Sequence, residues 1–280
     1  MKAKKFIVTA LIALLTAIYG CGRPVQAKQQ SDRRMNLIIL VDRSDSVTAA
    51  DRDFYLRWLM RDIYPILRPG DFVALGQFGE DALGDFEFLA EQRFPNASYE
   101  APSLFSMGDD PVTLQNRCLD ALANFENVEL PQFENSVQQQ LMRPPKDHRS
   151  CLVDAIGVVA SRLAARDSNN VLVVFSDGLE ACGGIDFENR PPQRNLVTAL
   201  ERSRRIPKLH GVDVYFVRKI DQRQAKRLGN SPAWIQQVTQ FWSDFFQAAR
   251  ASLVRIGPDP TFVDRQATPG GSAPKSRCGL

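Results

Sequence analysis

Short apolar runs rich in β-forming residues alternate with longer segments of helical periodicity from Met35 onward, and this alternation restricts the fold more than any other feature. NLIILV, DFVALGQF, NVLVVFSDG and VDVYFVRK predict strands, and DFEFLAEQRF and LVRIG predict two more. The segments with helical periodicity cover 48–66, 152–165, 195–204 and 233–251. Because parallel strands need long crossover connections, we predict an α/β fold with a doubly wound, mostly parallel central sheet flanked by helices.

Composition divides the chain into a leader, a domain and a tail. We expect one α/β domain over 35–257, followed by a flexible tail over 258–280 that is rich in Gly, Pro and Ser. Within the domain, 95–147 reads as an insertion on the sheet. It contains predicted helices near 112–125 and 133–141, separated by proline-containing loops.

The amino terminus has the features of a secretory signal. Three lysines precede an apolar stretch, 6–19, that is too short to cross a bilayer comfortably. Ile18 to Cys21 is similar to a bacterial lipobox, which would remove 1–20 and leave Cys21 lipidated. Val25 to Ala27 is similar to an ordinary cleavage site, which would remove 1–27. We therefore predict an exported, periplasmic or cell-envelope protein, and we favour the form that a lipid on Cys21 anchors to the membrane.

Charge and cysteine content exclude two kinds of function. The net charge is only +3 and no long basic run occurs, which argues against a nucleic-acid partner. A zinc site is excluded because there is no C-x-x-C and the two histidines, His148 and His210, lie far apart. Either cleavage leaves an even number of cysteines, which in an oxidising compartment favours disulfides and permits three pairings. These are Cys118, Cys151, Cys182 and Cys278.

Polar residues interrupt the pattern where predicted strands end or helices begin. Asp42, Ser44 and Ser46 follow the first strand, Ser150 precedes the helix at Leu152, and Asp177 follows VLVVFS. Ligands of parallel α/β sheets bind beyond the carboxyl ends of the strands, so the three loops are expected to converge. A cluster of carboxylates and hydroxyls suits a hard divalent cation, Mg²⁺ above all.

This order of residues resembles the von Willebrand factor type A domain, whose metal-ion-dependent adhesion site is written D-x-S-x-S, then threonine, then a later aspartate. Asp42, Ser44 and Ser46 match the first element, Ser150 stands at the threonine, and Asp177 in a D-G turn matches the aspartate. The resemblance covers about 35–257. It implies a Rossmann-like fold and a non-enzymatic domain whose bound cation captures an Asp or Glu of a partner protein.

Two positions depart from the family pattern. Serine at 150 keeps the hydroxyl of the usual threonine but lacks its methyl group, and Asp45 stands where glycine is common. Asp45 either faces solvent or adds negative potential that favours Mn²⁺ or Ca²⁺. Taken singly, each site residue also has a plainer interpretation, since the serines can cap a helix and Asp177 can form a turn.

Two other functions compete with metal-dependent binding. One is a structural envelope lipoprotein with a degenerate metal site. The other is a hydrolase that uses Ser150 and the nearby His148, which is disfavoured because the chain has no G-x-S-x-G elbow.

A convergent metal site also predicts one disulfide. Cys151 directly follows Ser150, and Cys182 lies five residues beyond Asp177, so loops that meet around one ion would bring the two cysteines together. A bridge requires α-carbons within about 7 Å, which neighbouring loops satisfy. We therefore predict a Cys151–Cys182 disulfide, which leaves Cys118 and Cys278 as a second pair or as free thiols.

Overall fold

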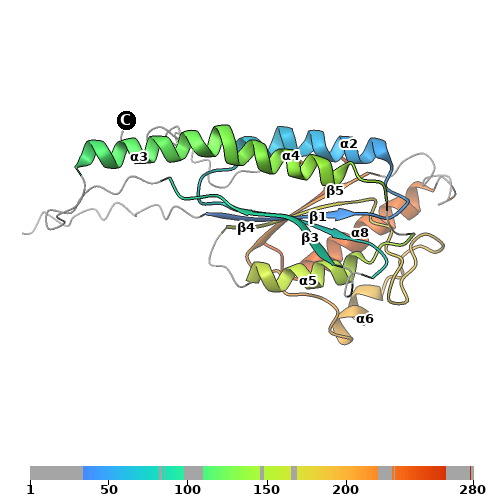
Figure 1. Ribbon diagram of the computed structural model, residues 1–280. Helices are drawn as coiled ribbons and strands as arrows, with labels where there is room; N and C mark the ends of the chain where they lie inside the picture. Colours follow the sequence, from blue (N-terminus) through green and yellow to red (C-terminus); the bar gives the residue numbers. More distant parts are fainter. Residues whose placement is uncertain are drawn as a thin grey trace, which may run out of the picture. The chain divides into compact units, whose positions relative to one another are not determined.

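A computed structural model describes residues 34–81, 84, 86–97, 110–145, 148–164, 169–219, 229, 231–262 and 278. These residues form one six-stranded sheet in the order β3-β2-β1-β4-β5-β6 (Figure 1). Its strands are β1 (Met35–Asp42), β2 (Phe72–Phe78), β3 (Glu87–Arg93), β4 (Asn169–Ser176), β5 (Val212–Arg218) and β6 (Leu253–Gly257). The predicted leader, with Cys21 and both cleavage sites, lies outside the described residues, as do 263–277 of the predicted tail.

The sheet is parallel except at β3, which pairs antiparallel with β2. The chain runs outward from β1 to β3 on one side, then crosses back and continues outward from β4 to β6 on the other. The strand order therefore reverses between β1 and β4, where a doubly wound sheet opens a crevice at its carboxyl edge. The predicted fold class is confirmed.

Helices cover both faces of the sheet and divide the core in two (Figure 1). Alternate β1 residues point to opposite faces, so Leu37 and Ile39 belong to one core, whereas Ile38 and Leu40 belong to the other. The first core is covered by α2 (Ala49–Trp58), with its extensions η1 (Leu59–Ile63) and η2 (Tyr64–Ile66), and by α4 (Leu130–Leu141). The second is covered by α5 (Leu152–Ala164), α6 (Leu196–Arg202) and α8 (Pro232–Ala248).

The segment 111–141 is continuous helix, and the loop expected between its two helices is absent. α3 (Pro111–Asn124) runs through a π-helical turn, η3 (Phe125–Glu129), directly into α4. Pro131 has no N–H to donate, which would normally interrupt a helix. It lies at the start of α4, directly after the π-helical turn, and that wider turn has a different hydrogen-bond register. Phe133, Val137 and Leu141 of α4 are buried in the core beside α2, so this part of the predicted insertion is a covering helix of the sheet.

Cys118 of α3 forms a disulfide with Cys278 near the carboxyl terminus, with α-carbons 5.7 Å apart. Both cysteines are buried in a small cluster with Ala97 and Leu122. The crosslink attaches residue 278 to the middle of α3, in the first half of the long helical segment. Within the part of the chain that the structure describes, no helix has the length and apolar character needed to cross a membrane.

Candidate metal centre

Asp42 and Asp177 stand at the carboxyl ends of the two strands between which the strand order reverses. Asp42 is the last residue of β1, and Asp177 directly follows β4. The strands are paired in register, with Val41 opposite Phe175, so the two aspartates leave the sheet side by side. Both carboxyl groups are buried, at 0% and 1% exposure.

The five predicted ligand residues are linked by hydrogen bonds. The Ser44 amide donates to Asp42 Oδ1 at 2.9 Å, and the Ser150 hydroxyl donates to Asp42 Oδ2 at 2.9 Å. The hydroxyls of Ser44 and Ser46 are 2.8 Å apart, and Ser46 in turn hydrogen bonds to Asp177. The three loops therefore meet at one point, as the sequence pattern predicts.

Ser176 is a site residue that the sequence analysis did not identify. Its hydroxyl donates to Asp42 Oδ2 at 2.6 Å and accepts the Gly178 amide at 2.9 Å. It thus connects the carboxylate of β1 to the turn that holds Asp177. The available signal was a hydroxyl residue directly before the D-G turn, at the carboxyl end of a strand adjacent to β1.

Gly178 permits the close packing behind the site. It has a φ of 77°, and a Cβ there would lie 2.9 Å from Arg218 Nε and 3.0 Å from Trp242 Nε1. Arg218 Nε donates to the carbonyl of Asp177 at 2.7 Å, and Trp242 Nε1 donates to the carbonyl of Gly178 at 2.9 Å. Two buried side chains from β5 and α8 therefore hold the backbone that presents Asp177.

Burial makes the site unfavourable for its own negative charges. Desolvation raises the pKa of Asp42 above its ordinary value of 3.8, although hydrogen bonds from Ser176 and Ser44 act in the opposite direction. Burial, followed by the charge of Asp42, raises the pKa of Asp177 from 3.8 to about 7. Burial also lowers the pKa of the nearby Arg218 to about 10. A bound cation would favour the ionised form of both aspartates.

The donor set fits a hard divalent cation. No group of three or more His, Cys, Asp or Glu side chains suited to a metal occurs among the described residues, so an ion here would need the hydroxyls as ligands. Two carboxylates would balance a doubly charged cation, and the serine hydroxyls would add neutral oxygen donors. Oxygen-only sites of this kind suit Mg²⁺, Mn²⁺ or Ca²⁺ better than zinc.

Asp45 and His148 form a separate pair on the surface. The His148 ring nitrogen Nδ1 lies 2.5 Å from Asp45 Oδ2, and both side chains are mostly exposed, at 85% and 52%. The Ser150 hydroxyl donates to Asp42 instead. Ser150 and His148, two positions apart in the sequence, thus have different partners.

The loop after β4 is fastened to the start of α5. Cys151 and Cys182 form a disulfide with α-carbons 5.1 Å apart, which is the pairing predicted from the sequence. The Ala181 amide donates to the carbonyl of Ser150 at 2.9 Å. Glu180 is fully buried, accepts the Val153 amide at 2.9 Å, and has its pKa raised by burial to about 8. These links fix Ser150 relative to the Asp177 loop.

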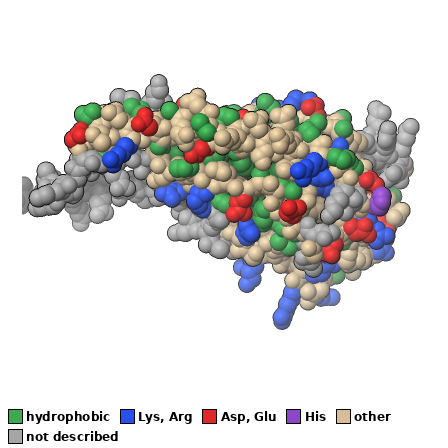
Figure 2. All heavy atoms as spheres, viewed as in Figure 1, with side chains coloured by type: hydrophobic (Ala, Val, Ile, Leu, Met, Phe, Trp, Pro, Cys, Tyr) green, Lys and Arg blue, Asp and Glu red, His purple; other side chains and the backbone are tan. Residues whose placement is uncertain are grey.

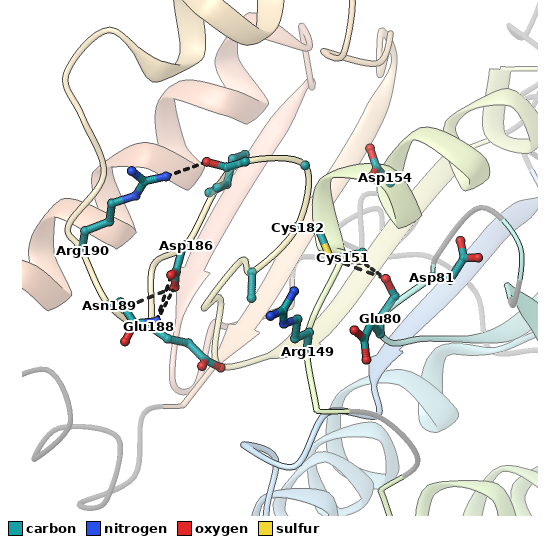
Figure 3. A pocket seen from close by; sticks show the side chains of 14 residues that line it. Glu80, Asp81, Arg149, Cys151, Asp154, Cys182, Asp186, Glu188, Asn189 and Arg190 are labelled. Atoms are coloured by element: carbon teal, nitrogen blue, oxygen red, sulfur yellow. Dashed lines mark hydrogen bonds between the residues drawn. A yellow bond between two sulfur atoms is a disulfide. The ribbon is translucent and has the colours of Figure 1, made fainter.

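A polar cavity of about 550 Å³ opens beside this disulfide (Figure 3). Both cysteines contribute to its wall, together with residues from the loops after β2 and β4. Its charged lining residues are Glu80, Asp81, Arg149, Asp154, Asp186, Glu188 and Arg190. The cavity therefore lies next to Ser150 and is lined by charges of both signs.

No protein-family profile matches the sequence, and no curated protein matches it significantly. Among solved structures, the chain is similar to the pilus adhesin SpaC from Lactobacillus rhamnosus GG, with 12% identity over 79% of this chain and 30% of that one (TM-score 0.38). It is also similar to manganese-loaded TRAP protein of Plasmodium vivax, with 13% identity over 71% and 64% of the chains (TM-score 0.33).

A third similar structure is proximal thread matrix protein 1 from the mussel byssus, with 12% identity over 78% of this chain and 49% of that one (TM-score 0.33). The chain spans less than two thirds of each of these three proteins. At this identity and TM-score, the similarities carry no inference about function. The arguments below rest on the residues of this chain.

Proposed function

We propose that this chain is a metal-dependent protein-binding domain of the cell envelope, in which a divalent cation captures an Asp or Glu side chain of a partner protein. The observation that supports it most is the joined network of Asp42, Ser44, Ser46, Ser150 and Asp177 at the point where the strand order reverses. Binding rather than catalysis is proposed, with Mg²⁺ as the preferred ion and Mn²⁺ or Ca²⁺ as alternatives.

Each residue of the network has a distinct role in this proposal. Asp42 and Asp177 would supply the negative charge that holds the cation. The three serines would supply oxygen donors without further negative charge, so the ion would still attract a carboxylate from outside. Ser46 is half-buried, unlike the fully buried Asp42, which places the accessible side of the network toward Ser46. When bound, the cation supplies the positive charge that a partner's carboxylate recognises.

Thermal unfolding with and without metal tests the proposal. A ligand that binds only the folded state raises the melting temperature as its concentration rises. We expect Mg²⁺ or Mn²⁺ to raise the melting temperature relative to chelator, and Asp42→Ala to remove that response. Asp45→Ala is the matched control, because Asp45 is exposed and pairs with His148, and it should keep the response.

Partner binding is tested by retention of periplasmic proteins on the immobilised chain. We expect proteins that are retained in Mg²⁺, released by chelator and not retained by the Asp42→Ala variant. The proposal would be contradicted if no divalent cation changed the melting temperature of the wild-type chain. That result would favour a structural envelope protein with a degenerate site.

A further inference from the structure

Tyr55 of α2 carries a polar group that the fold leaves unused. Its side chain is 0% exposed, and its hydroxyl has no hydrogen-bond partner among the residues that the structure describes. A buried hydroxyl without a partner lowers stability, so such groups are uncommon and call for an explanation. The surroundings of this hydroxyl indicate what it serves.

The ring of Tyr55 lies against the end of β4 that leads into the candidate metal centre. It stacks on Phe175 with ring centroids 4.6 Å apart and an interplanar angle of 23°. Phe175 is two residues before Asp177, and alternate residues of a strand point to the same face of the sheet. Continued by one step, this alternation puts Asp177 on the face that α2 covers, whereas Asp42 belongs with Leu40 to the opposite face. Tyr55 therefore lies on the Asp177 side of the candidate metal centre.

The direction of α2 points the hydroxyl toward this centre. Helical side chains lean toward the amino terminus of their helix, and α2 begins three residues after Ser46. Asp51 lies one turn before Tyr55 on the same side of the helix. Burial raises the pKa of the Tyr55 hydroxyl well above its ordinary value of 10.0. The negative charges of Asp177, Asp51 and Asp42 raise this pKa further, so the hydroxyl lies within range of all three carboxyl groups.

The surface at this end of the molecule is well supplied with polar groups. Figure 2 shows acidic and basic side chains mixed at the right-hand end of the view, toward which β1 points in Figure 1. The Tyr55 hydroxyl does not reach this surface, because the whole side chain is buried. Its acceptor is therefore to be sought inside, among the carboxyl groups that surround it.

Asp51 does not need this hydroxyl, because its carboxyl group already has partners. The Thr48 amide and hydroxyl donate to Asp51 Oδ2 at 3.0 and 2.6 Å, and Lys219 Nζ lies 3.1 Å from Asp51 Oδ1. Asp42 accepts hydrogen bonds at both of its oxygens and faces the other side of the sheet. The Asp177 side of the candidate metal centre is therefore where one more donor has the largest effect.

We propose that Tyr55 is a positioning residue of the metal centre, whose hydroxyl donates a hydrogen bond to the oxygen atoms on the Asp177 side of the loaded site. The inference rests on the proposed function, because it concerns the state in which a cation is bound. When both aspartates are ionised, negative charge increases within range of a donor that has no other acceptor. Outer hydrogen-bond partners of this kind orient metal ligands, and their loss typically weakens metal binding by about 10- to 100-fold. Tyr55 acts through Asp177 and is not itself a ligand.

Tyr55→Phe removes the hydroxyl alone, and its effects on stability and on metal affinity should have opposite signs. In chelator the variant should melt about 2–4 °C above the wild type, because a buried donor without an acceptor has been removed. Its dissociation constant for Mn²⁺, measured by competition with a metal-sensitive dye, should rise by roughly tenfold or more. A residue that only fills the core would not weaken metal binding while its substitution raises stability.

Tyr64→Phe is the matched control. Tyr64 is 4% exposed, and its hydroxyl also lacks a hydrogen-bond partner in the described part of the chain. Burial and then the charge of Glu134 raise the pKa of Tyr64, so its hydroxyl faces a different carboxyl group. The control should gain a similar amount of stability in chelator and should bind Mn²⁺ as the wild type does.

Ultraviolet difference spectra give an independent readout, because a tyrosine that gains a hydrogen bond changes its absorption. Mn²⁺ should produce a tyrosine difference signal in the wild type and in Tyr64→Phe, but not in Tyr55→Phe. If the wild type binds Mn²⁺ and Tyr55→Phe binds it equally well, this inference fails and the proposed function stands. Equal weakening in the two variants would also overturn the inference. A wild type that binds no divalent cation would overturn the proposed function and the inference together.

Discussion

The Asp177 carboxyl offers a direct test of the electrostatics of the site, because its folded-state pKa of about 7 lies above the ordinary value of 3.8. The folded protein therefore holds this proton more tightly than the unfolded chain does. Stability from this group is fully present below the unfolded pKa and decreases as the pH rises toward the folded pKa. Above about pH 7 the folded state carries the whole cost of the buried charge.

We expect Asp177→Asn to be more stable than the wild type in chelator at roughly pH 8, and the difference to shrink toward pH 4. Asparagine keeps an acceptor for the Leu179 amide but has no charge to bury. The melting temperature of both proteins across this pH range, with and without Mg²⁺, measures the effect. Mg²⁺ should stabilise only the wild type, and a difference independent of pH would contradict the assignment.

The sequence was sufficient to predict that the five hydroxyl and carboxyl residues lie together, because their order and spacing are local features, whereas a metal bound by them stays a prediction. The sequence was not sufficient to predict that Ser176 and Arg218 also contact the site. Whether the Ser176 hydroxyl reaches Asp42 depends on β4 lying next to β1, and strand order is a property of the whole sheet. Arg218 comes 41 residues after Asp177 and reaches its carbonyl only because β5 follows β4 in the sheet.

At the scale of elements, strand and helix boundaries followed the hydrophobic periodicity closely, as β1 and α5 show. The segment 111–141 was the exception. Proline at 131 indicates a helix boundary when the sequence is considered alone. The π-helical turn before it allows the helix to continue, and the apolar spacing of Phe133, Val137 and Leu141 then decides which face packs on the sheet. Tertiary packing outweighed the local signal.

The role of α4 in the core can be tested with one buried and one exposed substitution. Phe133→Ala removes a side chain that is 5% exposed and packs against Phe94, and it should lower the free energy of unfolding by about 3–5 kcal/mol. Val112→Ala, at a position 63% exposed, should change it by less than about 0.5 kcal/mol. Chemical denaturation measures both. Equal, small effects of the two substitutions would show that α4 does not contribute to the core.

The Cys151–Cys182 disulfide joins two of the three loops of the candidate metal centre. Replacing both cysteines by alanine opens a loop with a sequence separation of 31 residues and should cost about 3–4 kcal/mol in the chain-entropy picture. Because Ser150 adjoins Cys151, the stabilisation by Mg²⁺ should also weaken. Denaturation measures the first effect and metal titration the second. Non-reducing peptide mapping should yield 151–182 and 118–278, and a 151–118 linkage would contradict this arrangement of loops.

At the scale of the whole molecule, we expect the leader to decide whether the protein is attached to the membrane. If Cys21 is lipidated, Cys21→Ser should move the protein from the membrane fraction to the soluble fraction. Cell fractionation measures this, with an immunoblot of both fractions. A mature amino terminus at Lys28, or fractionation that the substitution leaves unchanged, would decide for the ordinary cleavage site.

The Cys118–Cys278 crosslink has a consequence for a molecule under tension. A pull between the two ends of the described chain would pass along 34–118 and then across the disulfide, because covalent bonds do not extend appreciably. β1, β2 and β3 lie on that route, whereas β4, β5 and β6 are bypassed. Asp42 would therefore bear load while Asp177 would not. A stretched domain would first lose the part of the candidate metal centre that β1 carries.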